Sequence, residues 1–174
     1  LEIPADAFDP VSRDVPNLLL VVDSSGSMKF NPSASGASRG KYDVVLMACW
    51  GLFRFLKERN LDDRVWINAL NFSGATRSSG WHRGNEVTPV KRVLAAYEGG
   101  GTTLNVSAVR TARDTCPGHF LLLAMTDGGL GNTPQALDEV RRTSEAGNGI
   151  ALLHVGTANA FTEGVRQLGG CVHI

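Results

Sequence analysis

Residues 18–27 read LLLVVDSSGS, five aliphatic residues followed by an acid and a cluster of serines around one glycine. A continuous apolar run of this kind is typical of a strand that is buried on both faces of a parallel sheet. We predict that 18–22 form a central strand with Asp23 at its carboxyl end. The pattern recurs at 120–125, where a second apolar run leads into Asp127, so a second buried strand should end in the same way.

Helical and strand patterns alternate along the rest of the chain. Helices are predicted at 42–59, 104–115, 133–147 and 161–168, with a helical turn at 90–97. Further strands are predicted at 65–72, 75–81, 150–155 and 171–174. The turn residues Ser73 and Gly74 should fold the strand at 75–81 back as a hairpin. This alternation predicts a three-layer α/β/α, Rossmann-like fold with a mainly parallel central sheet and a short antiparallel edge strand.

Length and composition indicate one domain. A chain of 174 residues can bury one substantial core. We assign the domain to residues 17–174 and a lead-in segment, which contains three prolines, to residues 1–16. The first residue is Leu1, which is compatible with excision of the domain from a longer protein.

The charge balance and the cysteines restrict the classes of partner and compartment. Basic and acidic residues each number 17, so the formal net charge is zero and no global field attracts nucleic acid or an anionic membrane surface. The longest apolar run is too short to span a membrane. Three scattered cysteines form neither a disulfide framework nor a zinc pattern. We therefore predict a cytoplasmic protein, with an extracellular location as the alternative if the chain is a fragment.

Oxygen-bearing side chains are concentrated in three predicted loops. These are Asp23-Ser24-Ser25-Gly26-Ser27, Gly101-Thr102 and Thr126-Asp127-Gly128. In an open α/β sheet, the loops beyond the carboxyl ends of the strands meet where the strand order reverses, and ligands bind there. Two carboxylates and several hydroxyls, without histidine or thiolate, suit a hard cation such as Mg²⁺ better than Zn²⁺ or copper.

Together, these stretches resemble the metal-ion-dependent adhesion site, or MIDAS, of the von Willebrand factor A (VWA) family. Their order, spacing and loop context all match, and the resemblance extends over nearly the whole chain from Asn17 onward. It implies a VWA fold with one Mg²⁺ site, for which Mn²⁺ and Ca²⁺ are alternative ions. The ligands that it implies are Asp23, Ser25, Ser27, Thr102 and Asp127.

The resemblance also implies a role for each ligand. By similarity to the family, the two serine hydroxyls should ligate the metal directly, and Thr102 should do so in the ligand-ready state. The two aspartates should act directly or through bound water, with Asp23 also orienting the serines. We prefer Thr102 to Thr103 because it directly follows the Gly-Gly pair. Thr103 would then be a hydrogen-bond donor to a group that itself binds the metal.

The family resemblance implies metal-dependent, non-enzymatic protein binding. Family members leave one metal position open, and a Glu or Asp carboxylate of a partner fills it. If water separates the ion from the two aspartates, the ion stays electrophilic and favours an anionic ligand. MoxR-type AAA+ ATPases are common partners of cytosolic relatives, so an assembly linked to such an ATPase is the candidate setting.

The strongest alternative is a Mg²⁺-dependent phosphoryl-transfer hydrolase, because a strand-end Asp beside a metal is similar to the haloacid dehalogenase phosphatases. Those enzymes need a second acid two residues after the nucleophile, and this chain has Ser25 there. A serine hydrolase is a weaker alternative, since the serine stretch lacks the first glycine of a nucleophile elbow. The simplest alternative is a strand-to-helix turn in which Asp and Ser satisfy backbone donors.

The segment 29–41 departs from the family pattern, which usually passes quickly from the serines into the first helix. The segment would lie beside the metal, so we consider it a candidate for partner selectivity. A surface loop without a binding role is the competing interpretation.

Overall fold

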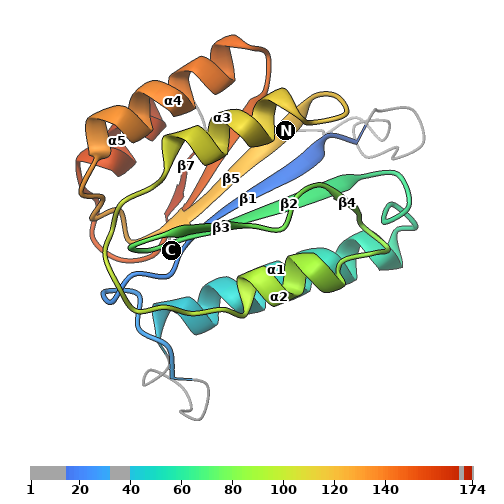
Figure 1. Cartoon of the computed structure of the whole chain (residues 1–174), viewed down its shortest axis with the longest axis horizontal. Helices are drawn as coiled ribbons and strands as arrows, with labels where there is room; N and C mark the ends of the chain where they lie inside the picture. The colour runs from blue at the N-terminus through green and yellow to red at the C-terminus, as the bar shows by residue number, and fades with distance from the viewer. Residues whose placement is uncertain (1–14, 32–39, 169–170, 174) are drawn as a thin grey trace, which may run out of the picture.

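The computed structural model describes residues 15–31 and 40–168 and the backbone of 171–173. The predicted lead-in segment 1–16 lies outside the described residues except for its last two, and so does most of the predicted loop 29–41. Figure 1 shows one sheet between two layers of helices.

The sheet has seven strands in the order β3-β2-β1-β5-β6-β7, and β4 also pairs with β2. The strands are β1 (Asn17–Asp23), β2 (Trp66–Phe72), β3 (Thr76–Ser78), β4 (His82–Arg83), β5 (Phe120–Thr126), β6 (Gly149–His154) and β7 (Cys171–His173). β1 pairs in parallel with β2 and β5, and parallel pairing continues through β6 to β7. β3 and β4 run antiparallel to β2. The predicted three-layer fold, with a mainly parallel sheet and an antiparallel edge strand, is confirmed.

Helices cover both faces of the sheet. They are α1 (Lys41–Glu58), α2 (Thr88–Leu94), α3 (Val106–Asp114), α4 (Thr133–Glu145) and α5 (Ala160–Gln167). The helices α1 and α2 pack on one face, and α3, α4 and α5 pack on the other (Figure 1). Across the described ranges, no helix is long and apolar enough to cross a membrane.

β1 is buried along its whole length because it contributes side chains to both layers. Leu18, Leu20 and Val22 pack in the core beneath α1 and α2, whereas Leu19 and Val21 pack in the core beneath α3, α4 and α5. Full burial of each such side chain stabilises the fold by roughly 1.5–3 kcal/mol. The uninterrupted apolar run therefore occupies the centre of the sheet, as predicted.

The edge of the sheet differs in detail from the prediction. Only 76–78 of the predicted strand at 75–81 form a strand, β3; β4 begins after the predicted range, at His82, and Gly80 lies between the two with a φ of 72°. That conformation favours glycine. Gly80 N donates to Ser78 Oγ at 3.1 Å, and Ser79 Oγ donates to Gly80 O at 2.8 Å. These local hydrogen bonds form a turn that interrupts the edge ladder.

Two helices, α2 and α3, begin two residues away from their predicted starts. α2 starts at Thr88, two residues before the predicted turn, with a proline in its first turn. α3 starts at Val106, two residues after the predicted start, because Asn105 Oδ1 accepts a hydrogen bond from Ser107 N at 3.0 Å and caps the helix.

β1 and β5 are neighbours at the point where the strand order reverses. Their pairing continues to Val22 and Met125, so Asp23 and Thr126, the last residues of the two strands, lie side by side. This is the edge at which open α/β sheets bind ligands. It carries the loop after β1 and the loop after β5, both of which the sequence selects as oxygen-rich.

Candidate metal site

The buried carboxylate of Asp23 links the ends of β1 and β5. Asp23 is fully buried; its Oδ1 accepts from Ser25 N at 2.8 Å and its Oδ2 accepts from Thr126 Oγ1 at 2.6 Å. Burial raises the pKa of the Asp23 carboxyl, the hydrogen bonds from Thr126 and Ser25 oppose that rise, and the charge of Asp127 adds to it. The contacts fix the carboxylate beneath the serine loop.

Two serine hydroxyls and one carboxylate oxygen form a chain of contacts above Asp23. Ser25 Oγ and Ser27 Oγ lie 3.0 Å apart, and Ser27 Oγ donates to Asp127 Oδ1 at 3.1 Å. Ser25 is buried and Ser27 is exposed. The chain of contacts therefore includes one buried and one exposed hydroxyl.

A glycine loop packs directly against the serine loop. Gly99 N donates to Ser24 O at 2.9 Å, and Gly26 N donates to Gly100 O at 3.1 Å. A Cβ at Gly26 would lie 3.1 Å from Gly99 O, so a side chain there would force the two backbones slightly apart. This close approach explains Gly26, whereas Gly99 has a φ of 69° and a Cβ at Gly100 would lie 2.6 Å from Ser73 Oγ.

Thr102 lies on the loop that follows these glycines. Its carbonyl oxygen accepts from Gly131 N at 2.9 Å, and a Cβ at Gly131 would lie 3.5 Å from Thr102 Oγ1 and 3.4 Å from Thr103 Oγ1. Both hydroxyls thus lie near the segment after β5. Among the described residues, no hydrogen bond joins the Thr102 hydroxyl to Ser25, Ser27 or Asp127.

Two neighbours of Asp127 are absent from the sequence prediction. Lys41 Nζ lies 2.8 Å from Asp127 Oδ2, and Asn159 Nδ2 donates to Asp127 O at 2.8 Å. Asn159 also caps α5, since its Oδ1 accepts from Phe161 N and Thr162 N. A cap is recognisable from an Asn before a helix, whereas no sequence pattern marks Lys41 as a contact of the loop after β5.

Solved structures share this architecture. No protein-family model matches the sequence, and no curated protein matches it. The VWA domain of SpRpn10 aligns with a TM-score of 0.69 at 10% identity, over 92% of this chain and 88% of that one. The chain has a von Willebrand factor A fold. The family resemblance in the sequence therefore gives the correct architecture.

Other structures align with this VWA fold. Manganese-loaded TRAP from Plasmodium vivax has a TM-score of 0.65 at 16% identity, over 92% of this chain and 68% of that one. The pilus adhesin SpaC from Lactobacillus rhamnosus GG has a TM-score of 0.68 at 15% identity and aligns over 93% of this chain. The chain spans 29% of the length of SpaC.

The donor set of this VWA fold fits a hard cation. Ser25, Ser27 and Asp127 present oxygens that are linked by contacts of 3.0 and 3.1 Å, and oxygen ligands suit Mg²⁺, Mn²⁺ or Ca²⁺. In the part of the chain that the structure describes, no group of three His, Cys, Asp or Glu side chains could hold a metal. Any site here must therefore use hydroxyls beside its two carboxylates.

Proposed function

We propose that this chain is a protein-interaction module that binds a divalent cation, Mg²⁺ in the first place, and uses it to hold an acidic side chain of a partner. The ligands would be Asp23, Ser25, Ser27, Thr102 and Asp127. The observation that carries the proposal is the linked set of serine and Asp127 oxygens where the loops after β1 and β5 meet.

The contacts of each residue support a distinct role. Asp23 is held by Ser25 N and Thr126 Oγ1, so its negative charge would remain beneath the serine loop when a cation enters. Ser25 and Ser27 would offer neutral hydroxyl oxygens, and Asp127 would offer a carboxylate oxygen next to the Ser27 hydroxyl. The bound cation would supply a concentrated positive charge that attracts a carboxylate.

Thr102 would contribute in the state that binds the partner. Its carbonyl oxygen accepts from Gly131 N, and Gly131 lies on the segment that follows Asp127. A shift of that segment would therefore move Thr102 together with Gly131. We propose that such a shift brings the Thr102 hydroxyl to the cation.

Similarity to proteins of known character supports binding rather than catalysis. One protein with this fold is described as a pilus adhesin and another has been solved with manganese. The position where a haloacid dehalogenase phosphatase needs its second acid is Ser25, whose hydroxyl contacts Ser27. A MoxR-type AAA+ ATPase is the partner class that we propose to test first, together with a cytoplasmic setting.

Chelator-dependent capture of a partner tests the proposal. The immobilised wild-type chain and its Ser27→Ala variant are incubated with purified MoxR-type ATPase, and with a lysate of cells that make the protein, in Mg²⁺ or in EDTA. Ser107→Ala is the matched control, because Ser107 is also exposed but lies on α3. We expect one set of partners to be lost both in EDTA and with Ser27→Ala, and to be kept by Ser107→Ala. Partners that are retained equally in all arms would contradict metal-dependent binding.

A further inference from the structure

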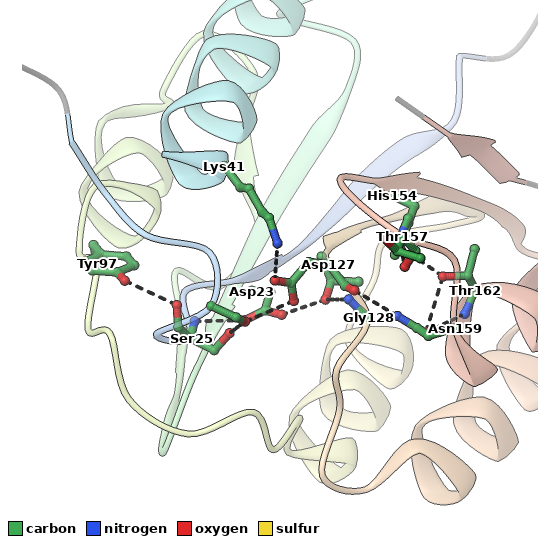
Figure 2. Close-up of polar contacts among 12 residues, drawn as sticks. Asp23, Ser25, Lys41, Tyr97, Asp127, Gly128, His154, Thr157, Asn159 and Thr162 are labelled. Atoms are coloured by element: carbon green, nitrogen blue, oxygen red, sulfur yellow. Dashed lines mark hydrogen bonds and ion pairs between the residues drawn. The ribbon is translucent and has the colours of Figure 1, made fainter. Parts of the chain in front are cut away.

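Lys41 brings a positive charge of the protein itself to the candidate metal ligands. Its Nζ lies 2.8 Å from Asp127 Oδ2, while Asp127 Oδ1 accepts from Ser27. The Asp127 side chain is 8% exposed and that of Lys41 is 41% exposed. Both carboxylate oxygens of Asp127 are therefore engaged, one by a proposed metal ligand and the other by an ammonium group (Figure 2).

The start of α1 is fixed against the serine loop. Tyr42 N donates to Met28 O at 3.0 Å, and Asp43 Oδ2 accepts from Gly40 N at 2.9 Å. These contacts lie on both sides of Lys41 in the sequence. The backbone that carries the ammonium therefore has a defined position relative to the serines.

The Lys41 side chain reaches the loops that follow β5 and β6. It contacts Asp127 in the first loop, and a Cβ added at Gly156 in the second would lie 3.5 Å from its Nζ. The ammonium thus lies at the carboxyl edge of the sheet, beside the proposed site.

We propose that Lys41 is a built-in counter-ion that competes with a divalent cation for Asp127 and so raises the cation concentration at which the site fills. This inference rests on the proposed function. A cation that approaches Asp127 is repelled by the ammonium, and like charges a few ångströms apart destabilise each other even in water. The cation therefore binds well only when the ion pair is open, and its apparent affinity falls with the fraction of open molecules.

A surface ion pair without influence on the site is the competing interpretation, since ion pairs with an exposed partner often contribute little to stability. The two interpretations differ in what removal of the ammonium does to cation affinity. Loss of a bystander leaves the affinity unchanged, whereas loss of a competitor increases it.

Calorimetric titration with Mn²⁺ separates the two interpretations. The full chain is titrated as wild type, Lys41→Met and Lys41→Arg, together with Lys57→Met. The last variant is the matched control, because Lys57 is an exposed lysine on the same helix and its removal changes the net charge equally. We expect Lys41→Met to bind Mn²⁺ about tenfold more tightly than wild type. Lys41→Arg, which keeps the charge, and Lys57→Met should remain close to wild type.

The outcomes distinguish this inference from the proposed function. Equal Mn²⁺ affinity of wild type and Lys41→Met overturns the role of Lys41 and leaves the metal site standing. An equal gain in Lys57→Met also overturns it, because the effect would then be one of net charge. Absence of Mn²⁺ binding in every variant overturns the proposed function itself.

Discussion

Thr126 Oγ1 donates a hydrogen bond of 2.6 Å to Asp23 Oδ2 and accepts one of 2.8 Å from Gly128 N. One hydroxyl thus joins the end of β5, the end of β1 and the turn that carries Asp127. Thr126 is 1% exposed and Asp23 is fully buried, so water cannot replace these contacts without a rearrangement.

Replacement of Thr126 by Val should destabilise the fold. The substitution keeps the shape of the side chain but removes the donor to Asp23 Oδ2 and the acceptor of Gly128 N, and an unsatisfied buried group costs about 1–3 kcal/mol. Urea unfolding in the presence of a chelator measures the loss. Thr115→Val is the control, because Thr115 is exposed and its hydroxyl bonds only to carbonyl oxygens of its own helix. If both variants lower the free energy of unfolding by the same amount, Thr126 has no special role.

Gly100 should not tolerate a side chain. A Cβ at this position would lie 2.6 Å from Ser73 Oγ, which accepts from Gly100 N at 3.0 Å and belongs to a fully buried residue. We expect Gly100→Ala to lower the free energy of unfolding by about 1–3 kcal/mol, as overpacking does. Gly129→Ala should change it by less than about 0.5 kcal/mol, because a Cβ there meets nothing within 4 Å. Thermal unfolding of both variants checks this difference. A Gly100→Ala variant as stable as Gly129→Ala would contradict the prediction.

Cys49 should make stability fall at alkaline pH. Burial raises the pKa of its thiol from 9.0 to about 12, so the folded chain keeps the proton while the unfolded chain loses it above about pH 9. The unfolded state then binds fewer protons, and the free energy of unfolding decreases as pH rises. Between about pH 8 and pH 10, this group should account for a decrease of about 1.4 kcal/mol.

Urea unfolding at the two pH values, in wild type and Cys49→Ala, isolates this contribution. Cys116, whose thiol pKa is also raised by burial, is present in both chains and cancels. The decrease in the free energy of unfolding should be smaller in Cys49→Ala by about 1.4 kcal/mol. Identical pH dependence of the two chains would show that Cys49 does not titrate differently on unfolding.

The sequence predicts the centre of the fold better than its edges. β1 and β5 are recognisable because strands buried on both faces need apolar residues in succession, as at Leu18 and its successors. At the edge, β3 and β4 are short and interrupted by the turn at Gly80. Short edge segments carry little hydrophobic pattern, so local hydrogen bonds decide where they end.

The candidate site divides in the same way. The spacing of Asp23, Ser25 and Ser27 selects residues of one loop, and Asp127 is found from the repeated strand-then-acid pattern. Lys41 could not be found, because its contact with Asp127 joins residues 86 positions apart and depends on how α1 begins. The part of loop 29–41 that the structure describes includes Phe30, whose ring lies 5.6 Å from that of Tyr97. The role of segment 29–41 in partner selectivity stays a prediction.

Direct titration with Mn²⁺ tests the central claim. The wild-type chain, Ser27→Ala and Ser107→Ala are compared by electron paramagnetic resonance of free Mn²⁺ at equal protein concentration. We expect wild type and Ser107→Ala to bind one ion per chain and Ser27→Ala to bind much more weakly, with Mg²⁺ displacing the bound Mn²⁺. Free Mn²⁺ that is undiminished by the wild-type chain, or diminished equally by Ser27→Ala, would contradict a cation site built on the serines after β1.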